Sequence, residues 1–373
     1  MRIAQIAPLM ESVPPKLYGG TERIVSHLSE ALVQLGHDVT LFASGDSVTS
    51  ARLVACTETA IRLNPAVQDY IPYYMIMLDK VRRSAHLFDI LHFHIDSFQM
   101  PLFRGMSSKT VTTLHGRQDL PDLLSLYNAF PEMPLVSISN AQREPIADAN
   151  FVNTIYHGLP LDLLAPNFEP RGGYVAFLGR ISREKRPDRA IAIAAALGLP
   201  LKIAAKVDKV DEAYFREEIA PLLNRPGVEY VGEINDRHKR KFLGDALALL
   251  FPIDWPEPFG LVMIEAMACG TPVLGFRCGS VPEIIDDRLT GRVVATVDEA
   301  IRVLPEVIRL DRRAVRRRFE ARFSISRMAS QYLDVYRGAS QGVEKPLLVR
   351  GDMAPAPNVI SLQRRNGAER HAI

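Results

Sequence analysis

The sequence predicts an α/β protein made of two doubly wound domains, each a parallel sheet covered by helices. Three observations lead to this prediction. The chain has 373 residues, about twice the usual size of one domain, and 47% of them are hydrophobic, so two cores can form. Short apolar segments recur, each followed by a stretch with helical spacing, which is typical of parallel α/β layers. A polar stretch with prolines and glycines, residues 161–173, divides these segments into two series.

Each series contains six expected strands. The first six are residues 3–8, 38–43, 89–94, 110–115, 135–139 and 154–157. The second six are residues 174–179, 201–205, 228–231, 246–251, 272–276 and 291–295. We therefore expect residues 1–165 to form an N-terminal domain and residues 166–340 a C-terminal domain.

Three further segments have a clear character. Residues 22–35 predict an amphipathic helix that Gly36 ends, because the apolar residues recur on one stripe. The arginine-rich run at 312–322 predicts a helix whose basic face is solvated, since acidic residues are interspersed. From residue 341 to residue 373 the chain mixes Pro, Gly, Arg and Asn without an apolar period, and we expect a disordered tail.

Composition excludes several classes of protein. A net charge of +2 argues against a general nucleic-acid binder, which carries a strong basic excess. The three cysteines, Cys56, Cys269 and Cys278, lack the spacing of zinc ligands and suit a reducing compartment. No apolar run approaches the roughly 20 residues of a membrane span, and we expect the chain to open on a strand without a leader. We expect a cytoplasmic protein, with a peripheral membrane contact left open.

Two carboxylates, Glu257 and Glu265, bracket the start of a predicted helix. The helix is expected to begin near Gly260, to contain the apolar run 261–264 and to stop at Gly270. The spacing of about two turns would let both acids lean toward one ligand at the unpaired amides of the helix start. Alternatively, Glu257 only stabilises the helix dipole, whereas a buried Glu265 needs a partner because an unpaired buried carboxylate costs several kcal/mol.

Glycines and cations supply two more candidate sites. Gly19 and Gly20 lie between the first strand and the first helix, where a phosphate can approach the backbone closely, although a plain turn would also explain them. Arg180 and Lys185 follow the first strand of the second series and can stabilise a diphosphate leaving group, which gains negative charge as its bond breaks. The other interpretation of these cations is a solvated surface.

Histidines end or line two strands of the first series. His115 follows an expected strand, so it should face the ligand-binding edge of the sheet, unless it is a structural histidine. His92 and His94 alternate onto one face, but no third ligand is suggested, so we favour a structural role over a metal site. The chain has no Asp-x-Asp to hold a divalent ion against a diphosphate, which indicates that cationic side chains take that part.

Taken together, these features resemble the retaining glycosyltransferases of family 4, which have the GT-B fold of two Rossmann-like domains facing across a cleft. The resemblance covers residues 1–338. The matching segments are 19–23, 35–40, 137–139, 155–158, 179–180 with Lys185, 257–265 and 279–283. One departure is Ala204-Ala205-Lys206-Val207-Asp208, where many members have an Ala-Gly-x-Gly stretch. Arg143, after the Ser-Ile-Ser segment, would reach an acceptor or face solvent.

The resemblance implies a role for each candidate residue. Arg180 and Lys185 would hold the donor diphosphate, Glu265 the ribose hydroxyls and Glu257 a hydroxyl of the donor sugar. His115 would meet the sugar from the other wall. The phosphates and the sugar would be contacted by Gly19, Gly20, Phe259, Gly260 and Leu261. The nucleobase would be contacted by Gly232, Glu233 and Ile234. A C-terminal helix within 325–337 would cross back onto the first domain, the acceptor-side domain.

The implied activity is transfer of a hexose from a nucleotide diphosphate sugar to an acceptor hydroxyl with retention of configuration. UDP-glucose is the first expectation for the donor and GDP-mannose the second. The acceptor would be a sugar, a lipid-linked or a small-molecule hydroxyl compound, with no metal or other cofactor and no nucleic acid. Two alternatives stay open, a nucleotide-sugar epimerase of similar fold and a sugar-nucleotide-binding protein without catalysis.

Overall fold

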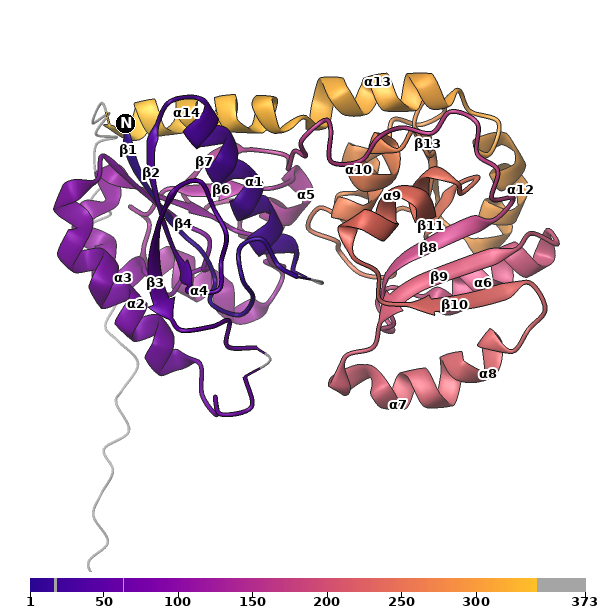
Figure 1. Cartoon of the computed structure of the whole chain (residues 1–373), viewed down its shortest axis with the longest axis horizontal. Helices are drawn as coiled ribbons and strands as arrows, with labels where there is room; N and C mark the ends of the chain where they lie inside the picture. The colour runs from indigo at the N-terminus through magenta and orange to yellow at the C-terminus, as the bar shows by residue number, and fades with distance from the viewer. Residues whose placement is uncertain (17–18, 63, 341–373) are drawn as a thin grey trace, which may run out of the picture. The chain divides into compact units, whose positions relative to one another are not determined.

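The computed structural model describes residues 1–16, 19–62 and 64–340, and all of these belong to one compact unit. Two parallel β-sheets, each packed against helices, make up this unit (Figure 1). The first sheet is built from residues 2–154 and the second from residues 175–294. The predicted α/β architecture of two doubly wound sheets is therefore present. The predicted disordered tail, residues 341–373, lies outside the described residues.

The first sheet has the strand order β3-β2-β1-β4-β5-β6-β7, with every neighbouring pair parallel. Its register is set near the centre, where Ile3 pairs with Val39 on one side and Ile90 on the other. The strands are β1 Arg2–Ile6, β2 Asp38–Ser44, β3 Arg52–Thr57, β4 Ile90–Phe93, β5 Thr110–Thr113, β6 Leu135–Ser137 and β7 Phe151–Thr154.

Two predictions for this sheet are wrong. The strand β3 was not expected, because its residues are mostly half-exposed at the sheet edge and lack a buried apolar run. The strand expected at 154–157 lies earlier, at Phe151–Thr154, although Ile155 still donates its amide to Ser137 O at 2.8 Å. The apolar residues after β7 are buried in the core rather than paired in the sheet.

The second sheet has the order β10-β9-β8-β11-β12-β13 and is also parallel throughout. All six strands predicted for this series are present. They are β8 Val175–Arg180, β9 Leu201–Lys206, β10 Val228–Gly232, β11 Leu249–Phe251, β12 Val273–Phe276 and β13 Gly291–Val294. Central strands such as β11 and β12 are buried on both faces, which explains their unbroken apolar sequences.

Helices connect and cover the strands. Those in the first half are α1 Gly20–Gln34, α2 Ile71–Ser84, α3 Met100–Phe103, α4 Pro121–Ala129 and α5 Asn140–Arg143. Those that follow are α6 Pro187–Ala196, α7 Glu212–Tyr214, α8 Ala220–Leu223, α9 Asp236–Gly244, α10 Leu261–Ala268, α11 Val281–Ile284, α12 Val297–Val307, α13 Arg312–Phe323 and α14 Ile325–Ser340. No helix within the described residues combines the length and apolar character that a membrane span requires.

Helix α14 packs against elements of the first half of the chain. It contacts α1 and also β4 and β5, and it lies beside α1 in Figure 1. Its residues Tyr332 and Tyr336 are fully buried, and the Tyr336 hydroxyl accepts a hydrogen bond from Gln5 Nε2 at 3.1 Å. The last helix of the described residues thus completes the core that packs against the first sheet.

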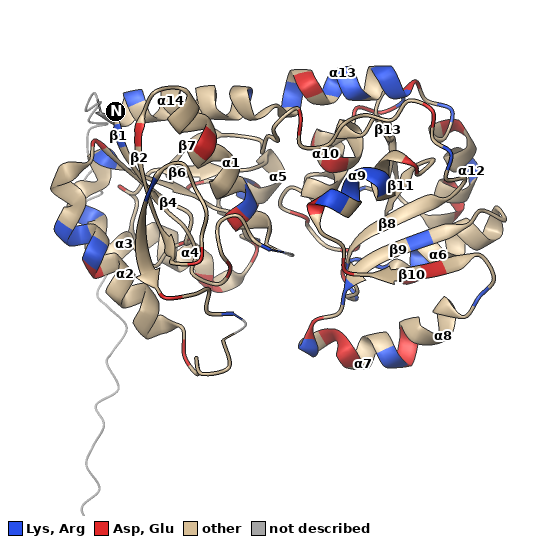
Figure 2. Cartoon of the chain, in the orientation of Figure 1, with Lys and Arg blue, Asp and Glu red and all other residues tan. Residues whose placement is uncertain are grey.

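The prediction that the arginine-rich run has a solvated face is wrong for part of it. Figure 2 shows basic residues along α13, but Arg312 and Arg316 are buried. Arg312 donates to Gly244 O, Ala246 O and Asn167 O at 2.7–2.9 Å. These carbonyls lie at the end of a helix or in loops, where no backbone amide of the described residues bonds them. A guanidinium has five N–H donors and can bond several such carbonyls at once. Burial lowers the pKa of Arg312 to about 10.

Candidate functional site

A pocket of about 420 Å³ is lined by residues from both halves of the chain. It lies at the carboxyl ends of β5, β8 and β9 and at the starts of α1 and α10. The predicted site residues that line it are Gly19, Gly20, His115, Arg180, Lys185, Glu233, Ile234, Glu257, Phe259, Gly260, Leu261 and Glu265. Gly232 is the exception: it ends β10, with a φ of 74°, and does not line the pocket.

Arg180 is the last residue of β8, so the end of the strand carries its guanidinium into the pocket. Nη1 lies 3.5 Å from Asp208 Oδ2 and Nη2 lies 3.5 Å from Glu184 Oε2. A third carboxylate, Asp211 Oδ2, lies 3.9 Å from Nη1. These contacts are long and partly open to solvent, and such pairs contribute little free energy. An incoming phosphate can therefore compete with the three carboxylates for the guanidinium.

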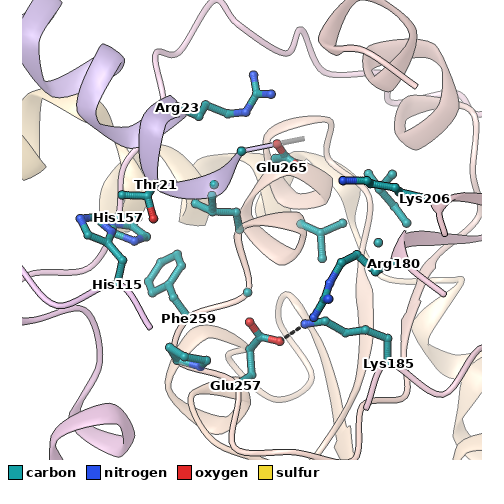
Figure 3. Close-up of a pocket in the computed structure, with 18 of the residues that line it drawn as sticks. Thr21, Arg23, His115, His157, Arg180, Lys185, Lys206, Glu257, Phe259 and Glu265 are labelled. Atoms are coloured by element: carbon teal, nitrogen blue, oxygen red, sulfur yellow. Dashed lines mark hydrogen bonds and ion pairs between the residues drawn. The ribbon is translucent and has the colours of Figure 1, made fainter. Parts of the chain in front are cut away.

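Lys185 and Glu257 form an ion pair in the pocket, drawn as a dashed line in Figure 3. The same carboxylate oxygen, Glu257 Oε2, accepts a hydrogen bond from Trp255 Nε1 at 2.9 Å. Lys185 Nζ also lies 4.8 Å from the centre of a Trp255 ring, which adds a cation–π attraction. The lysine and glutamate side chains are only 14% and 11% exposed, so the ammonium group is held in one place.

The turn before α11 supports the backbone of Glu257. A Cβ atom on Gly279 would lie 2.4 Å from both the N and the O of Glu257, so a side chain does not fit there, and the φ of +53° also favours glycine. Ser280 donates its amide to Glu257 O and its hydroxyl to Phe259 O, both at 2.9 Å. The segment 279–283 thus acts as a support for the loop that carries the acid.

Helix α10 begins at Leu261, directly after Gly260, whose φ is +78°. The prediction that a helix starts between the two acids is confirmed. The reason given for their convergence is wrong, because Glu257 lies in the preceding loop and not on the helix. Both carboxylates line the pocket because that loop returns past the helix start.

Glu265 has a partner that the sequence did not reveal. Lys239 Nζ, on α9, donates to Glu265 Oε1 at 2.7 Å, and the carboxylate side chain is only 5% exposed. Lys239 also lies 3.3 Å from Asp236, which in turn forms an ion pair with Arg23 of α1. Opposite charges therefore alternate from Arg23 to Glu265. Within the part of the chain that the structure describes, Oε2 of Glu265 forms no hydrogen bond, so it is available to a ligand.

The starts of α1 and α10 come close together. A Cβ atom on Gly20 would lie 3.5 Å from Leu261 Cδ1. Because the first amides of each helix lack backbone acceptors, this part of the pocket suits an anion. Glu22, in the first turn of α1, is buried here, and burial raises the pKa of its carboxyl to about 7, with a smaller contribution from Glu11.

Aromatic rings form the opposite wall. His115 stacks on His157, with ring centres 5.3 Å apart, and His157 meets Phe259 edge-on at 4.8 Å. In Figure 3 these three rings lie together, away from Arg180 and Lys206. Burial lowers the pKa of His115 to about 3, so the imidazole is neutral. This wall can pack against a sugar ring and offer it a neutral polar atom.

The remaining candidates have partners within the protein. Both ring nitrogens of His92 and both of His94 are within hydrogen-bonding distance of other side chains. Lys206 lines the pocket and pairs with Asp208 at 2.8 Å. Arg143 lies over the ring of Phe151 at 4.7 Å and does not line the pocket. Residues 1–16, 19–62 and 64–340 contain no group of three or more side chains arranged to hold a metal ion.

Sequence reasoning missed several pocket residues. Lys239 is 26 positions away from its partner Glu265, and no spacing rule joins them. Trp255 could have been predicted as a site residue, because it is the single tryptophan of the chain and lies two residues before Glu257. Glu22 belongs to the segment 19–23, but the sequence alone indicates no role for it, because its burial depends on the folded structure.

Two family models match the chain, one in each half. The family described as "Glycosyl transferases group 1" matches residues 165–320, and the family described as "Glycosyltransferase Family 4" matches residues 18–154. The first match contains Arg180, Lys185, Glu257 and Glu265, and the second contains His115. Together the two matches span most of the chain.

Individual relatives are similar over nearly their whole length. The alpha-maltose-1-phosphate synthase of Mycolicibacterium smegmatis is 24% identical, over 90% of this chain and 100% of that protein. The sucrose-phosphate synthase of Thermosynechococcus elongatus has a TM-score of 0.74 at 20% identity, covering 90% and 98% of the two chains. The Anabaena protein HepE, solved with UDP and glucose, has a TM-score of 0.69 at 16% identity, covering 90% and 99%.

Proposed function

Because this chain belongs to the group 1 glycosyltransferases of family 4 and has their GT-B fold, we propose that it transfers a hexose from a nucleotide diphosphate sugar to an acceptor hydroxyl with retention of configuration. UDP-glucose is the first donor we propose and GDP-mannose the second. The acceptor is a sugar, a lipid-linked or a small-molecule hydroxyl compound.

One observation carries this proposal: a single pocket brings Arg180 and Lys185 together with Glu257 and Glu265 and with the starts of two helices. A nucleotide sugar has three parts that need separate recognition. Its diphosphate requires positive charge and free amides, and its ribose and hexose require hydrogen-bond acceptors for their hydroxyls. The pocket offers each of these within one volume.

The chemical step depends on the two cations. As the bond between the anomeric carbon and the phosphate oxygen breaks, negative charge grows on the diphosphate, and positive side chains already in place stabilise it. Arg180 can exchange its long contacts with Asp208 and Glu184 for phosphate oxygens. Lys185 is already oriented by Glu257, so little reorganisation is needed when the charge develops.

Retention requires the acceptor to attack on the face from which the diphosphate leaves. The leaving phosphate oxygen then lies next to the acceptor hydroxyl and can take its proton, so a protein general base is unnecessary. We propose that neither Glu257 nor Glu265 transfers a proton. With Arg180 and Lys185 available for the diphosphate, we also propose that the reaction needs no metal ion or other cofactor.

Each end of the donor has its own contacts. Glu265 Oε2 would accept from the ribose hydroxyls while Oε1 stays with Lys239. Glu257 Oε1 would accept from a hydroxyl of the hexose while Oε2 holds Lys185 and Trp255. We propose that the backbone near Gly232, Glu233 and Ile234 contacts the nucleobase, with Glu233 and Ile234 nearest, since both line the pocket.

The preference for UDP-glucose over GDP-mannose rests on similarity to other proteins and not on a contact that would select the nucleobase or the sugar. HepE, a protein of similar fold, was solved with UDP and glucose, which supports the choice of UDP-glucose. A cytoplasmic location remains a proposal, supported by the free thiols of Cys56, Cys269 and Cys278. A peripheral membrane contact would follow only from a lipid-linked acceptor.

Donor binding can be measured by thermal shift against a panel of nucleotide sugars. A ligand at 100 times its Kd stabilises by roughly 2.7 kcal/mol, so UDP-glucose should raise the Tm more than GDP-mannose or the other members of the panel. Selective protection by GDP-mannose would contradict the first choice of donor. Formation of an epimer from donor alone would contradict transfer as the activity.

Site assignment can be tested by kinetics on Lys185→Ala, with Arg183→Ala as the matched control. The two residues share a loop, but Arg183 is 68% exposed, pairs with Glu218 and does not line the pocket. We expect kcat/KM to fall by about 100-fold or more for the lysine variant, as when one stabilising donor is lost, and by less than twofold for the control. A change below twofold in both variants would show that the site is wrongly assigned.

A further inference from the structure

A continuous chain of hydrogen bonds runs from His115, at the pocket, to helix α14. His115 Nε2 lies 2.9 Å from His94 Nδ1, and His94 Nε2 lies 2.8 Å from Gln5 Oε1. The amide nitrogen of Gln5 donates to the hydroxyl of Tyr336 at 3.1 Å. Gln5, His94 and Tyr336 are each at most 2% exposed, so water does not compete for these bonds.

The direction of every bond in this chain follows from Gln5. A carbonyl oxygen only accepts, so His94 Nε2 carries the proton. Burial lowers the pKa of His94 well below its ordinary value, so its ring is neutral and Nδ1 is an acceptor. His115 Nε2 must therefore donate to His94, and the neutral ring of His115 has its lone pair on Nδ1.

His115 Nδ1 is the end of the chain that faces a ligand. Within the described residues, no side chain or backbone group forms a hydrogen bond with this atom, and it is not among the buried polar atoms that lack a partner. His115 itself lines the pocket. An acceptor nitrogen at this position can accept a hydrogen bond from a sugar hydroxyl but cannot donate one to it.

We propose that Gln5 and Tyr336 are positioning residues that fix the tautomer of His115, so that its Nδ1 accepts a hydrogen bond from a sugar hydroxyl in the pocket. This inference deepens the proposed function and rests on it, because a sugar substrate supplies the hydroxyl. It gives α14, which lies far along the sequence, a part in recognition of the sugar.

The orientation of the Gln5 amide is the critical point. If the amide were turned by half a rotation, its nitrogen would face His94, every bond would reverse, and His115 Nδ1 would become a donor. The bonds around Tyr336 are compatible with the orientation that the structure has. Its hydroxyl lies 2.7 Å from His92 Nδ1 and can donate there while accepting from Gln5, and His92 Nε2 then donates to Thr113 Oγ1 at 2.8 Å.

The tautomer can be read directly by long-range ¹H–¹⁵N correlation NMR on protein labelled with ¹⁵N-histidine, with signals assigned through His115→Gln and His94→Gln. In the unmodified protein, we expect the proton on Nε2 in both rings. In Gln5→Met, His94 loses its acceptor, so we expect a measurable fraction of His115 with the proton on Nδ1 and a fall in kcat/KM of at least tenfold.

Two tyrosines of α14 provide a matched pair. Tyr336→Phe removes the acceptor that orients Gln5 and should shift the tautomer as Gln5→Met does. Tyr332 is equally buried, but its hydroxyl bonds Thr113 at 2.9 Å and does not touch Gln5 or His94. It reaches them only through Thr113, His92 and Tyr336, and Thr113 can still accept from His92 without it. Tyr332→Phe should leave the His115 tautomer unchanged and kcat/KM within twofold, even if both variants lose similar stability.

Two results would overturn the inference. One is a proton on His115 Nδ1 in the unmodified protein, and the other is Gln5→Met with unchanged tautomer and unchanged kcat/KM. The failure of the proposed function looks different. In that case the NMR spectrum would show the expected tautomers while no nucleotide sugar of the panel is consumed by the unmodified protein.

Discussion

Lys185 and Glu257 work as one unit, in which the negative charge of the acid holds the lysine ammonium in the pocket. The amide introduced by Glu257→Gln would still accept from Trp255 but would no longer attract Lys185 by its charge. We expect kcat/KM to fall by about 100-fold, mostly through kcat, because the ammonium would no longer be held where charge develops. Steady-state kinetics measure this. Glu218→Gln, which is remote from the pocket, should stay within twofold; equal losses in both variants would contradict the claim.

Glu22 makes the stability of the protein depend on pH. The folded-state pKa, about 7, lies above the ordinary value of 4.5, so the folded protein binds the proton more tightly than the unfolded chain. The tighter proton binding by Glu22 contributes fully to the free energy of unfolding below pH 4.5, and this contribution is lost as pH rises through 7. We expect Glu22→Gln to raise the free energy of unfolding by about 2 kcal/mol at pH 8 and by less than 1 kcal/mol at pH 5.

Urea unfolding of Glu22→Gln and the unmodified protein at the two pH values measures this difference. Glu30→Gln serves as a control, because hydrogen bonds from Thr49 and Ser50 lower the pKa of the Glu30 carboxyl instead. An effect of Glu22→Gln that is the same at pH 5 and pH 8 would mean that the Glu22 carboxyl does not titrate near neutrality.

At the scale of elements, helix α13 bonds segments that are distant in the sequence, and its own sequence does not predict these contacts. Arg312 bonds three backbone carbonyls and the hydroxyl of Thr271, so Arg312→Met keeps the length of the side chain but leaves these acceptors unpaired. We expect the free energy of unfolding to fall by about 3 kcal/mol. Chemical denaturation measures the loss. Arg317→Met, on the exposed face of the same helix, should cost less than about 0.5 kcal/mol.

Elements were predictable where local pattern and burial agree. All six strands of the second sheet and the helix over residues 22–35 follow from apolar runs and stripes, and the structure has α1 at Gly20–Gln34. The edge strand β3 was not predicted because an edge strand buries few side chains and so lacks a buried apolar run. The arginines of α13 were misjudged because a buried guanidinium that bonds distant carbonyls has the same sequence spacing as a solvated one.

At the scale of the whole molecule, Glu283 joins the two halves of the chain. Its carboxylate, on α11, accepts from the backbone amides of Asn140 and Ala141 at 2.8 and 2.7 Å and from the Tyr156 hydroxyl at 2.9 Å. The acid also lies at the start of α5, where negative charge is favourable. The recognised segment 279–283 therefore supports Glu257 at one end and holds α5 at the other.

Removing this link should loosen the molecule more than removing a similar contact within one half. We expect Glu283→Ala to lower the free energy of unfolding by about 2 kcal/mol, because four charge-assisted donors, including the side-chain amide of Asn140, lose their acceptor. Glu299→Ala is the control, since among the described residues that carboxylate accepts a hydrogen bond only from the nearby amide of Ala295, at 2.8 Å. Equal losses in the two variants, measured by urea unfolding, would argue against a special role for Glu283.

The candidate site was predictable in its residues but not in its partnerships. Motif spacing identified Arg180, Lys185, Glu257 and Glu265, and all four line one pocket. The pairing of Glu265 with Lys239 and the chain from His115 to Tyr336 depend on segments that meet only after folding. Such contacts join residues far apart in sequence, and a single sequence has no signal for them.

The most direct test of the central claim follows donor cleavage by time-resolved ¹H NMR, which requires no knowledge of the acceptor because water can replace it. With UDP-glucose, the unmodified protein should release UDP and, before mutarotation, α-glucose, while Lys185→Ala should do so about 100-fold more slowly. Release of β-glucose first would contradict retention. An equal rate in Lys185→Ala would contradict the assignment of the chemical step to this pocket.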